Sequence, residues 1–326
     1  MLDIDVKAKK LKKQNKMNKQ KIILDCDPGH DDAIAILLAI ASPKIDLLGI
    51  TVAAGNQTIE KTSQNALNVA RFLGSKVPIA IGCALPIVKE RVICSEVHGE
   101  TGLDGFIFPE YKKDFDKRHA CQLMIDLIMA NDDVTVVTCG PMTNLALAMR
   151  LEPKIVSRIN KVVLMGGSTD NGNTSPAAEF NIMCDAEAAH IVFNSGVDVY
   201  MCGLNITRKV LVYDKIVDRI EKIHNRVSDM FVKLIRVFNE NQRKTFGLEA
   251  GPLHDPVTIV SLIDDSVIDF EKMNVTIDIN HGTSYGRTNC DVFDYLHLPK
   301  NAYVAMDINV DKYWDIIEEA IRSFSR

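Results

Sequence analysis

Four aspartates lie within eight consecutive residues near the start of the chain: Asp25, Asp27, Asp31 and Asp32. A Pro-Gly dipeptide separates the two pairs and favours a turn, so the four carboxylates are expected to crowd into one small region. Like charges this close are unfavourable unless a cation neutralises them or their pKa values rise. Oxygen ligands alone select a hard cation such as Ca²⁺ or Mg²⁺ rather than zinc. The run therefore predicts a metal or catalytic site.

Two other interpretations of this run exist. One aspartate could simply cap a following helix, but a single helix N-terminus cannot accommodate four charges. An Asp-x-Asp pair after a buried strand also opens the haloacid dehalogenase-type phosphohydrolases, in which the first Asp accepts a phosphoryl group and Mg²⁺ assists. Those enzymes usually carry Thr or Val after the turn, and later a Lys and a second acidic pair. Here the next residues are His30, Asp31 and Asp32, which do not fit that pattern.

The elements that must position these side chains alternate between short apolar runs and longer helical patterns. Strands are expected at 21–25, 46–52, 78–81, 134–138, 161–165 and 197–202, and helices at 31–40, 59–73, 143–151 and 185–193, the last with Asp185 as its N-cap. This alternation predicts an α/β fold: a mostly parallel, open, Rossmann-like central sheet with helices on both faces. Ligands of such sheets bind beyond the carboxyl ends of the strands.

Polar residues come directly after several of the expected strands. They lie at 27–32, at Asn56, at 138–140 and at 165–173. The C-terminal third is less regular, with helices expected at 227–239 and 313–324 and strands at 275–279 and 304–308. Another helix is expected to begin with Asp255 as its N-cap and Pro256 as its first residue.

Charge divides the chain into a basic leader, residues 1–20, and one expected domain, residues 21–326. Residues 1–21 hold eight Lys and two Asp, so of 38 Lys+Arg and 43 Asp+Glu the remainder keeps 30 and 41, a net charge near −11. This strongly negative net charge after the first 21 residues argues against nucleic acid as a partner. We expect the leader to be poorly ordered. No apolar run is long enough to cross a bilayer, and the leader lacks the apolar region of a secretory signal.

The eight cysteines form no CxxC pair, and several lie in apolar strand-like runs. Buried free thiols in a reducing compartment explain this better than disulfides or zinc. We therefore expect a cytoplasmic protein.

Six segments, in order, resemble the inosine–uridine-preferring nucleoside hydrolases. They are 21–38 (KIILDCDPGHDDAIAILL), 55–58 (GNQT), 98–103 (HGETGL), 138–144 (TCGPMTN), 165–167 with 173–181 (MGG and NTSPAAEFN), and 254–256 (HDP). Each segment alone is weak evidence for this family, but six of them in the same order are specific evidence. Only the leader falls outside the region that they cover. The resemblance implies hydrolysis of the N-glycosidic bond of ribonucleosides to ribose and free base, in nucleoside salvage.

Position by position, the resemblance implies a Ca²⁺ site formed by Asp27, Asp32, Asp255 and the main-chain carbonyl of Thr138. Asp27 is also the candidate general base for the calcium-activated water. His254 is the candidate acid that protonates the departing base, a task suited to a His near neutrality. Asp255 could instead serve only as a helix cap.

The same resemblance implies a set of substrate contacts. The expected contacts are Asp31, Asn56, His98, Met165, Asn173, Glu179 and Asn181. On an extended segment Glu179 and Asn181 would face the same side. His98 could instead be a structural loop residue, and Asn173 an ordinary turn residue.

Two segments depart from the family pattern, 167–172 (GSTDNG) and 238–253 (FNENQRKTFGLEAGPL). Phe238 and Phe246 stand where some relatives carry Tyr, and Arg243 is a candidate to position the base. Both segments are expected to be mobile lids over the nucleobase. Base preference, purine or pyrimidine, stays open.

The leading hypothesis is therefore a calcium-dependent nucleoside hydrolase acting on a small-molecule ribonucleoside, as a homodimer or homotetramer by implication of the family. A non-catalytic ribonucleoside-binding protein and a Mg²⁺-dependent phosphohydrolase are the alternatives.

Overall fold

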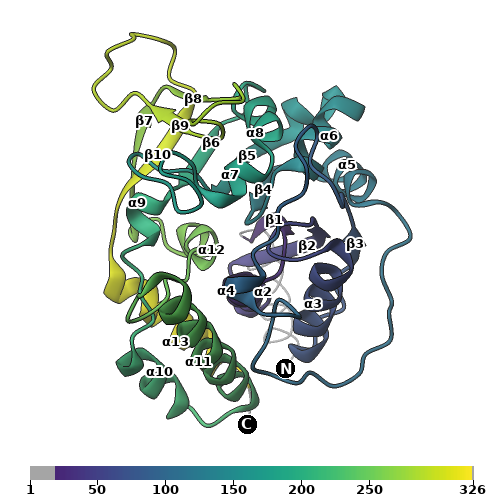
Figure 1. Cartoon of the computed structure of the whole chain (residues 1–326). Coiled ribbons are helices and arrows are strands. Elements are labelled where there is room, and N and C mark those ends of the chain that lie inside the picture. Colours follow the sequence, from purple (N-terminus) through teal and green to yellow (C-terminus); the bar gives the residue numbers. More distant parts are fainter. Residues whose placement is uncertain (1–18, 325–326) are drawn as a thin grey trace, which may run out of the picture.

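The computed structural model describes residues 19–324 and is built around one large sheet (Figure 1). Its strands are β1 (Gln20–Cys26), β2 (Ile45–Val52), β3 (Ile79–Ile81), β4 (Val134–Thr138), β5 (Ile159–Met165), β6 (Val199–Cys202), β7 (Ile268–Met273) and β10 (Ala302–Ile308). They lie in the order β3-β2-β1-β4-β5-β6-β10-β7. Every neighbouring pair is parallel except β10 with β7. The predicted mostly parallel sheet is confirmed.

Side chains of the central strands pack alternately on two hydrophobic layers, as the period of two along a strand requires. Ile22 and Leu24 of β1 belong to one layer, and Ile23 belongs to the other. The first layer is covered by α2 (His30–Ala41), α3 (Ile59–Phe72), α12 (Pro256–Ile263) and α13 (Val310–Arg322), and the second by α5 (Ala120–Ala130), α6 (Thr143–Leu151) and α8 (Ala186–Phe193). Helices therefore cover both faces, as predicted.

The strand order reverses at β1, which pairs with β2 on one side and β4 on the other. In doubly wound sheets this reversal opens a crevice outside the carboxyl ends of the two strands. The acidic run begins at the end of β1, and Thr138 is the last residue of β4. The topology thus places two of the predicted segments on either side of one crevice.

Several smaller elements differ from the sequence prediction. The helix expected to end at Asn239 continues as α11 (Arg226–Phe246), whose buried face extends to Gln242. The segment expected to be an extended loop up to Asn181 contains α7 (Phe180–Cys184). The remaining elements are α4 (Ser95–His98), η1 (Pro153–Arg158), α9 (Leu204–Thr207), α10 (Asp214–Glu221) and the antiparallel pair β8 (Val275–Ile277) and β9 (Thr288–Cys290).

No helix among residues 19–324 is long and apolar enough to span a membrane. The predicted leader lies outside the described residues except for Lys19 and Gln20, and Gln20 is already the first residue of β1.

Candidate active site

The carboxylate of Asp27 lies at the carboxyl end of β1, fully buried between two glycines. A Cβ atom at Gly55 or at Gly140 would collide with it, so both turns need glycine to leave room for this side chain. Asp27 Oδ2 accepts a 2.6 Å hydrogen bond from the main-chain N–H of Asn56, whereas Oδ1 has no hydrogen-bond partner among the described residues. A buried charged oxygen without a partner is costly, which indicates that this oxygen is meant to meet a ligand.

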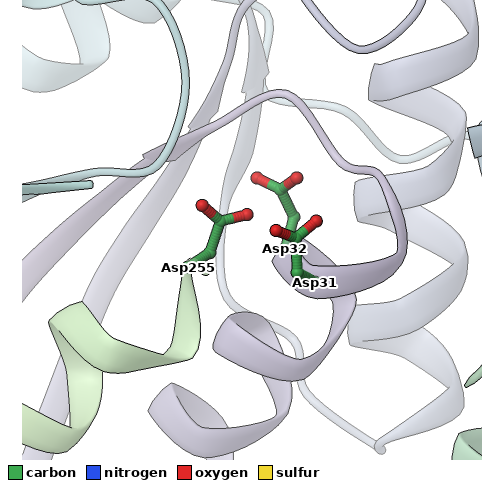
Figure 2. Close-up of side chains that lie close together, drawn as sticks. All are labelled: Asp31, Asp32 and Asp255. Carbon is green, nitrogen blue, oxygen red and sulfur yellow. The ribbon is translucent and has the colours of Figure 1, made fainter. Parts of the chain in front are cut away.

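Three further carboxylates converge beside Asp27. Figure 2 shows Asp31 and Asp32, from the start of α2, pointing toward Asp255, the residue before α12. One oxygen of each lies within 4.8 Å of the others, and all three side chains are buried. Within residues 19–324, Asp31 Oδ1 also lacks a hydrogen-bond partner. Hard-cation sites are built from oxygen atoms in such clusters, so these residues can hold a metal.

The expected metal ligands are therefore brought together in part. Asp32 and Asp255 lie in the group of three, and Asp31, which was expected to contact the sugar, completes it. Asp27 lies next to the group, with its main-chain N–H 3.3 Å from Asp32 Oδ1. Asp255 stands before α12, where a cap was possible, but its side chain makes no capping hydrogen bond and is left free for the cluster.

Burial and mutual repulsion raise the pKa values of these carboxyl groups. Burial raises the pKa of Asp31 to about 6, and burial followed by the nearby Asp31 raises that of Asp32 to about 7. The pKa values of Asp27 and Asp255 rise well above the ordinary value, again first through burial. Such an array stores repulsion that a bound cation would relieve.

Asn56, in the turn after β2, joins the carboxylates. Its side-chain amide donates to Asp32 Oδ2 at 3.0 Å and to the main-chain oxygen of Asp27 at 3.2 Å. Asp25 points elsewhere: it accepts hydrogen bonds from Thr51 at 2.6 Å and Asn144 at 2.9 Å. Asp25 therefore links the ends of β1 and β2 to the start of α6 rather than entering the cluster.

The predicted sugar contacts line one cavity of about 640 Å³ above the acidic cluster. The lining includes Asp31, Asn56, His98, Met165, Asn173, Glu179, Asn181, His254 and Asp255. A cavity of this size can take a small molecule such as a nucleoside.

Glu179 and Asn181 reach this cavity in a way the sequence did not predict. Glu179 is the N-cap of α7, and its carboxylate accepts from the main-chain N–H groups of Gly167, Asn181 and Ile182. The side-chain amide of Asn181 donates to the main-chain oxygens of Cys139 and Met165, which leaves its own carbonyl oxygen for a ligand. The expected extended geometry is wrong, because the cap and first turn of a helix place both residues.

Two imidazoles stand on the walls of the cavity. His254 Nδ1 lies 2.7 Å from the Thr207 hydroxyl, and burial together with Arg208 lowers the pKa of His254 to about 3. His98, at the end of α4, has its pKa held well below the ordinary value by burial. Both rings are therefore neutral in the structure.

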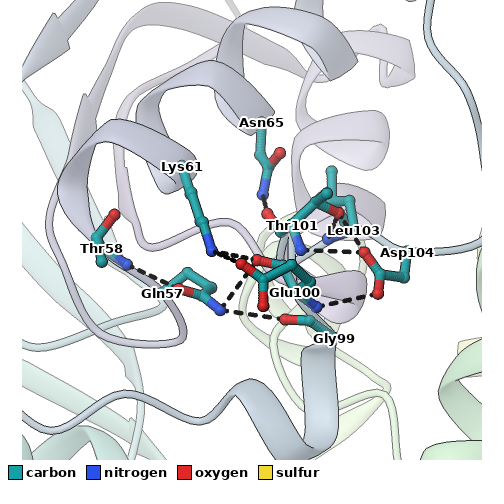
Figure 3. A network of polar contacts seen from close by, with 9 residues as sticks. All are labelled: Gln57, Thr58, Lys61, Asn65, Gly99, Glu100, Thr101, Leu103 and Asp104. Carbon is teal, nitrogen blue, oxygen red and sulfur yellow. Dashed lines mark hydrogen bonds and ion pairs between the residues drawn. The ribbon is translucent and has the colours of Figure 1, made fainter.

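Hydrogen bonds hold the loop after His98 against α3 and the turn before it (Figure 3). The side-chain amide of Gln57 donates to the main-chain oxygens of Gly99 and Glu100, and Asn65 donates to that of Thr101 at 2.9 Å. The Asp104 carboxylate accepts from the N–H groups of Glu100 and Thr101, both at 3.0 Å. The segment resembling the family's HGExG loop thus holds His98 at the cavity.

One face of α11 builds a further part of the cavity lining. Phe238, Gln242 and Phe246 repeat every fourth residue and line the cavity together, as neighbours on a helix face do. The expectation that Arg243 positions the base is wrong: this residue does not line the cavity, and its guanidinium donates to the main-chain oxygen of Glu249. The four-residue spacing from Phe238 could have identified Gln242.

The two expected lids also differ from the prediction. Of 167–172, only Gly172 lines the cavity, and Ser168 at its start is buried and hydrogen-bonded to Thr288 of β9 in both directions. The first half of 238–253 is helical. The segment 238–253 still lines the cavity, through Phe238, Gln242, Phe246, Leu248 and Pro252, and a segment that the sequence did not single out contributes as well, through Val92, Ile93, Cys94, Glu96 and Val97.

Comparison with known proteins gives one consistent family. The family model described as "Inosine-uridine preferring nucleoside hydrolase" matches residues 22–315. The pyrimidine-specific ribonucleoside hydrolase RihB of Shigella sonnei is 44% identical over 309 residues, covering 94% of this chain and 99% of the relative. RihB of Escherichia coli (strain K12 / DH10B) is 43% identical over the same coverage.

A solved structure gives the same result at the level of the fold. The purine-preferring ribonucleoside hydrolase from Gardnerella vaginalis superposes with a TM-score of 0.87 at 30% identity, covering 93% of this chain and 98% of that one. With a family match over nearly all described residues, the chain belongs to the inosine-uridine preferring nucleoside hydrolase family.

Proposed function

We propose that this protein hydrolyses the N-glycosidic bond of ribonucleosides, releasing ribose and the free base. The observation that carries the proposal is the placement of carboxylate oxygens of Asp27 and Asp31, which have no hydrogen-bond partner within residues 19–324, at a nucleoside-sized cavity that is also lined by a neutral imidazole. A protein that only binds nucleosides has no need for a buried, unpaired carboxylate that can take a proton from water. The family membership supports the same reaction.

The acidic cluster fits a hard cation, which we propose to be Ca²⁺. Asp27, Asp32, Asp255 and the carbonyl of Thr138 are the proposed ligands, and Asp31 is near enough to share in holding the ion. When bound, the cation would make a water more acidic and hold hydroxyl oxygens of the sugar.

Ribose recognition is assigned to oxygen atoms that the fold leaves free. Asp31 and Glu179 offer carboxylate oxygens, and Asn56 and Asn181, whose amide groups are engaged elsewhere, offer their carbonyl oxygens to sugar hydroxyls. Met165 supplies an apolar wall and Asn173 lies at the rim. Cleavage builds positive charge on the ribose ring, as in an oxocarbenium ion. Carboxylates and amide oxygens around the ring stabilise that charge.

Proton transfers are assigned to two residues. Asp27, whose Oδ1 is buried and unpaired among the described residues, accepts the proton of the attacking water. His254 gives a proton to the departing base. The ring is neutral in the structure because burial lowers its pKa to about 3, and negative charge growing on the leaving base favours the protonated imidazole.

Pyrimidine ribonucleosides are the proposed preferred substrates. The relatives with 43–44% identity are named as pyrimidine-specific, whereas the purine-preferring enzyme is 30% identical. We extend the oligomer expected of the family, a homodimer or homotetramer, to this chain as a proposal that sedimentation analysis would test.

A substrate panel tests the proposal. The protein with added Ca²⁺ is incubated with uridine, cytidine, inosine, 2′-deoxyuridine and a phosphomonoester, and free base, ribose and phosphate are measured. The expected order places uridine and cytidine above inosine. 2′-Deoxyuridine should be a poor substrate, because its loss of a hydroxyl leaves buried polar groups unpaired. Phosphate release alone would overturn the proposal in favour of a phosphohydrolase.

A further inference from the structure

Two cysteines lie close together where the edge strand β3 packs against α5. Cys83 follows the end of β3 by two residues, and Cys121 is the second residue of α5. Ala80 of β3 and Ala120 of α5 belong to one small buried cluster, which brings the two cysteines beside them into the same region. Cys121 belongs to the second hydrophobic layer, and Cys83 packs against that layer. Both have free thiols in the structure.

Asn144, near the start of α6, contacts both cysteines. Its side-chain oxygen accepts a 2.9 Å hydrogen bond from the main-chain N–H of Cys83, and its main-chain oxygen accepts one of 3.4 Å from the Cys121 thiol. Gly82 permits this approach, because a Cβ there would lie 2.3 Å from the side-chain oxygen of Asn144. With both cysteines held on one residue, the Cys83 thiol donates a hydrogen bond to the Cys121 sulfur.

The surroundings of Cys121 favour its thiolate form. The hydrogen bond from the Cys83 thiol lowers the pKa of Cys121. Cys121 also lies in the first turn of α5, where the positive end of the helix dipole stabilises a thiolate. Cys83 keeps its proton, because the same hydrogen bond and burial raise its pKa. Cys83 is half-buried and Cys121 is buried, so a small oxidant reaches the pair from the side of Cys83.

We propose that Cys83 and Cys121 form a modification site, at which a peroxide oxidises the two thiols to a disulfide. The Cys121 thiolate attacks one peroxide oxygen, and the O–O bond breaks. The hydroxide that leaves takes up the proton lost by the thiol, and Cys121 becomes a sulfenic acid. The Cys83 sulfur then attacks the Cys121 sulfur, so that an S–S bond forms, the S–O bond breaks and water leaves with the Cys83 proton. Two thiols are oxidised, and hydrogen peroxide is reduced to two molecules of water.

The disulfide closes a loop that carries part of the cavity wall. The residues between the two cysteines, 84–120, include α4 and the cavity-lining residues from Val92 to His98. Neither Cys83 nor Cys121 lines the cavity itself. A cross-link restricts the unfolded chain, so oxidation stabilises the folded protein. This inference goes beyond the proposed function, because the disulfide forms whether or not a nucleoside is cleaved.

Peptide mapping tests the proposal directly. The full chain is treated with hydrogen peroxide, the peroxide is removed, and the protein is unfolded in iodoacetamide to block the remaining thiols. Tryptic peptides are then analysed by mass spectrometry without reduction, and the expected product joins peptide 77–89 to peptide 119–150. Fragmentation assigns the linked sulfur, because Cys139 lies in the same peptide as Cys121. No cross-link, a link from Cys83 to Cys139, or sulfinic acid without a link would overturn the proposal.

Thermal unfolding gives a second readout that does not depend on activity. In the wild type, oxidation should raise the midpoint of unfolding by about 5 °C, the scale of one disulfide in a large domain. Dithiothreitol should reverse this shift. Cys83→Ser and Cys121→Ser should each abolish both the cross-link and the shift. The matched control is Cys290→Ser, which removes another half-buried thiol and should retain both. A shift that persists in Cys83→Ser and Cys121→Ser would contradict the proposal.

Discussion

Thr207 Oγ1 lies 2.7 Å from His254 Nδ1, at the end of α9 and just before α12. The hydroxyl occupies one nitrogen of the ring, so Nε2 is the nitrogen left for the cavity. Thr207 is fully buried, which holds this pair in place.

Removing the Thr207 hydroxyl should weaken catalysis without weakening the fold much. Thr207→Val keeps the shape and loses the hydrogen bond, so kcat on uridine should drop roughly tenfold. Thr207→Ser keeps the hydroxyl and serves as the control. Steady-state kinetics of both variants on uridine and on 4-nitrophenyl riboside, whose leaving group departs without a proton, check the expectation. An equal loss in Thr207→Ser, which keeps the hydroxyl, would contradict this role of the hydrogen bond.

His254→Ala should retain the cation and lose nucleoside hydrolysis. General acid catalysis contributes on the order of 10²–10⁴-fold, so uridine turnover should fall within that range. Turnover of 4-nitrophenyl riboside should fall far less. Calcium binding measured by calorimetry should remain close to that of the wild type. Equal losses on both substrates would refute the role of His254 in protonating the base.

Asp255→Asn should weaken the cation site. Asp255 is one of the three carboxylates that meet within 4.8 Å, and an amide offers less negative charge to a hard cation. Calcium affinity should fall by at least roughly a hundredfold, more than the loss expected for a residue outside the coordination shell. Asp132→Asn, at an exposed aspartate, is the control and should bind as the wild type does. Unaltered affinity in Asp255→Asn would place the cation elsewhere.

Cation binding should release protons, and the release should depend on pH. The pKa values of Asp31 and Asp32, raised to about 6 and about 7, mean that both groups are partly protonated in the metal-free protein near these pH values. Because ligands must be deprotonated, calcium affinity should rise as the pH rises through this range. Proton release should be largest at low pH and fade as pH rises. Calorimetry in buffers of different ionisation enthalpy measures it; affinity independent of pH would contradict the expectation.

Gly140→Ala should displace Asp27. The new Cβ would collide with Oδ1, and a displacement on the ångström scale can cost roughly a hundredfold in rate. Gly282→Ala is the matched control, because no described atom lies within 4 Å of a Cβ there. Activity on uridine and thermal unfolding should be measured for both. Wild-type activity of Gly140→Ala would show that the position of Asp27 is not critical.

Strand periodicity was enough to predict most of the central sheet. The strand–helix alternation identified all strands of the sheet from β1 to β6, and the polar residues after β1, β2 and β4 marked the crevice. It missed β7, whose sequence IDFEKM mixes charged and apolar residues at a sheet edge. It also could not predict the α11 face, because the contact of that face with the cavity depends on tertiary packing.

The roles of individual residues were harder to predict from the sequence than the positions of the helices and strands. The family pattern identified Asp32 and Asp255, which lie in one group with Asp27 next to it, but did not indicate that Asp31 completes that group. The sequence also did not indicate the contacts of His30, because its partners, His98 and Asp104, are 68 and 74 positions away along the chain. Contacts over such separations leave no local pattern in a single sequence.

The most direct test of the central claim is the balance of products from uridine. The protein is incubated with uridine and Ca²⁺ in phosphate-free buffer, and uracil and free ribose are measured by chromatography. The account predicts uracil and ribose in equal amounts, a complete stop on addition of EDTA, and recovery when excess Ca²⁺ is restored. Uridine that binds but is never cleaved, or cleavage that EDTA leaves untouched, would contradict it.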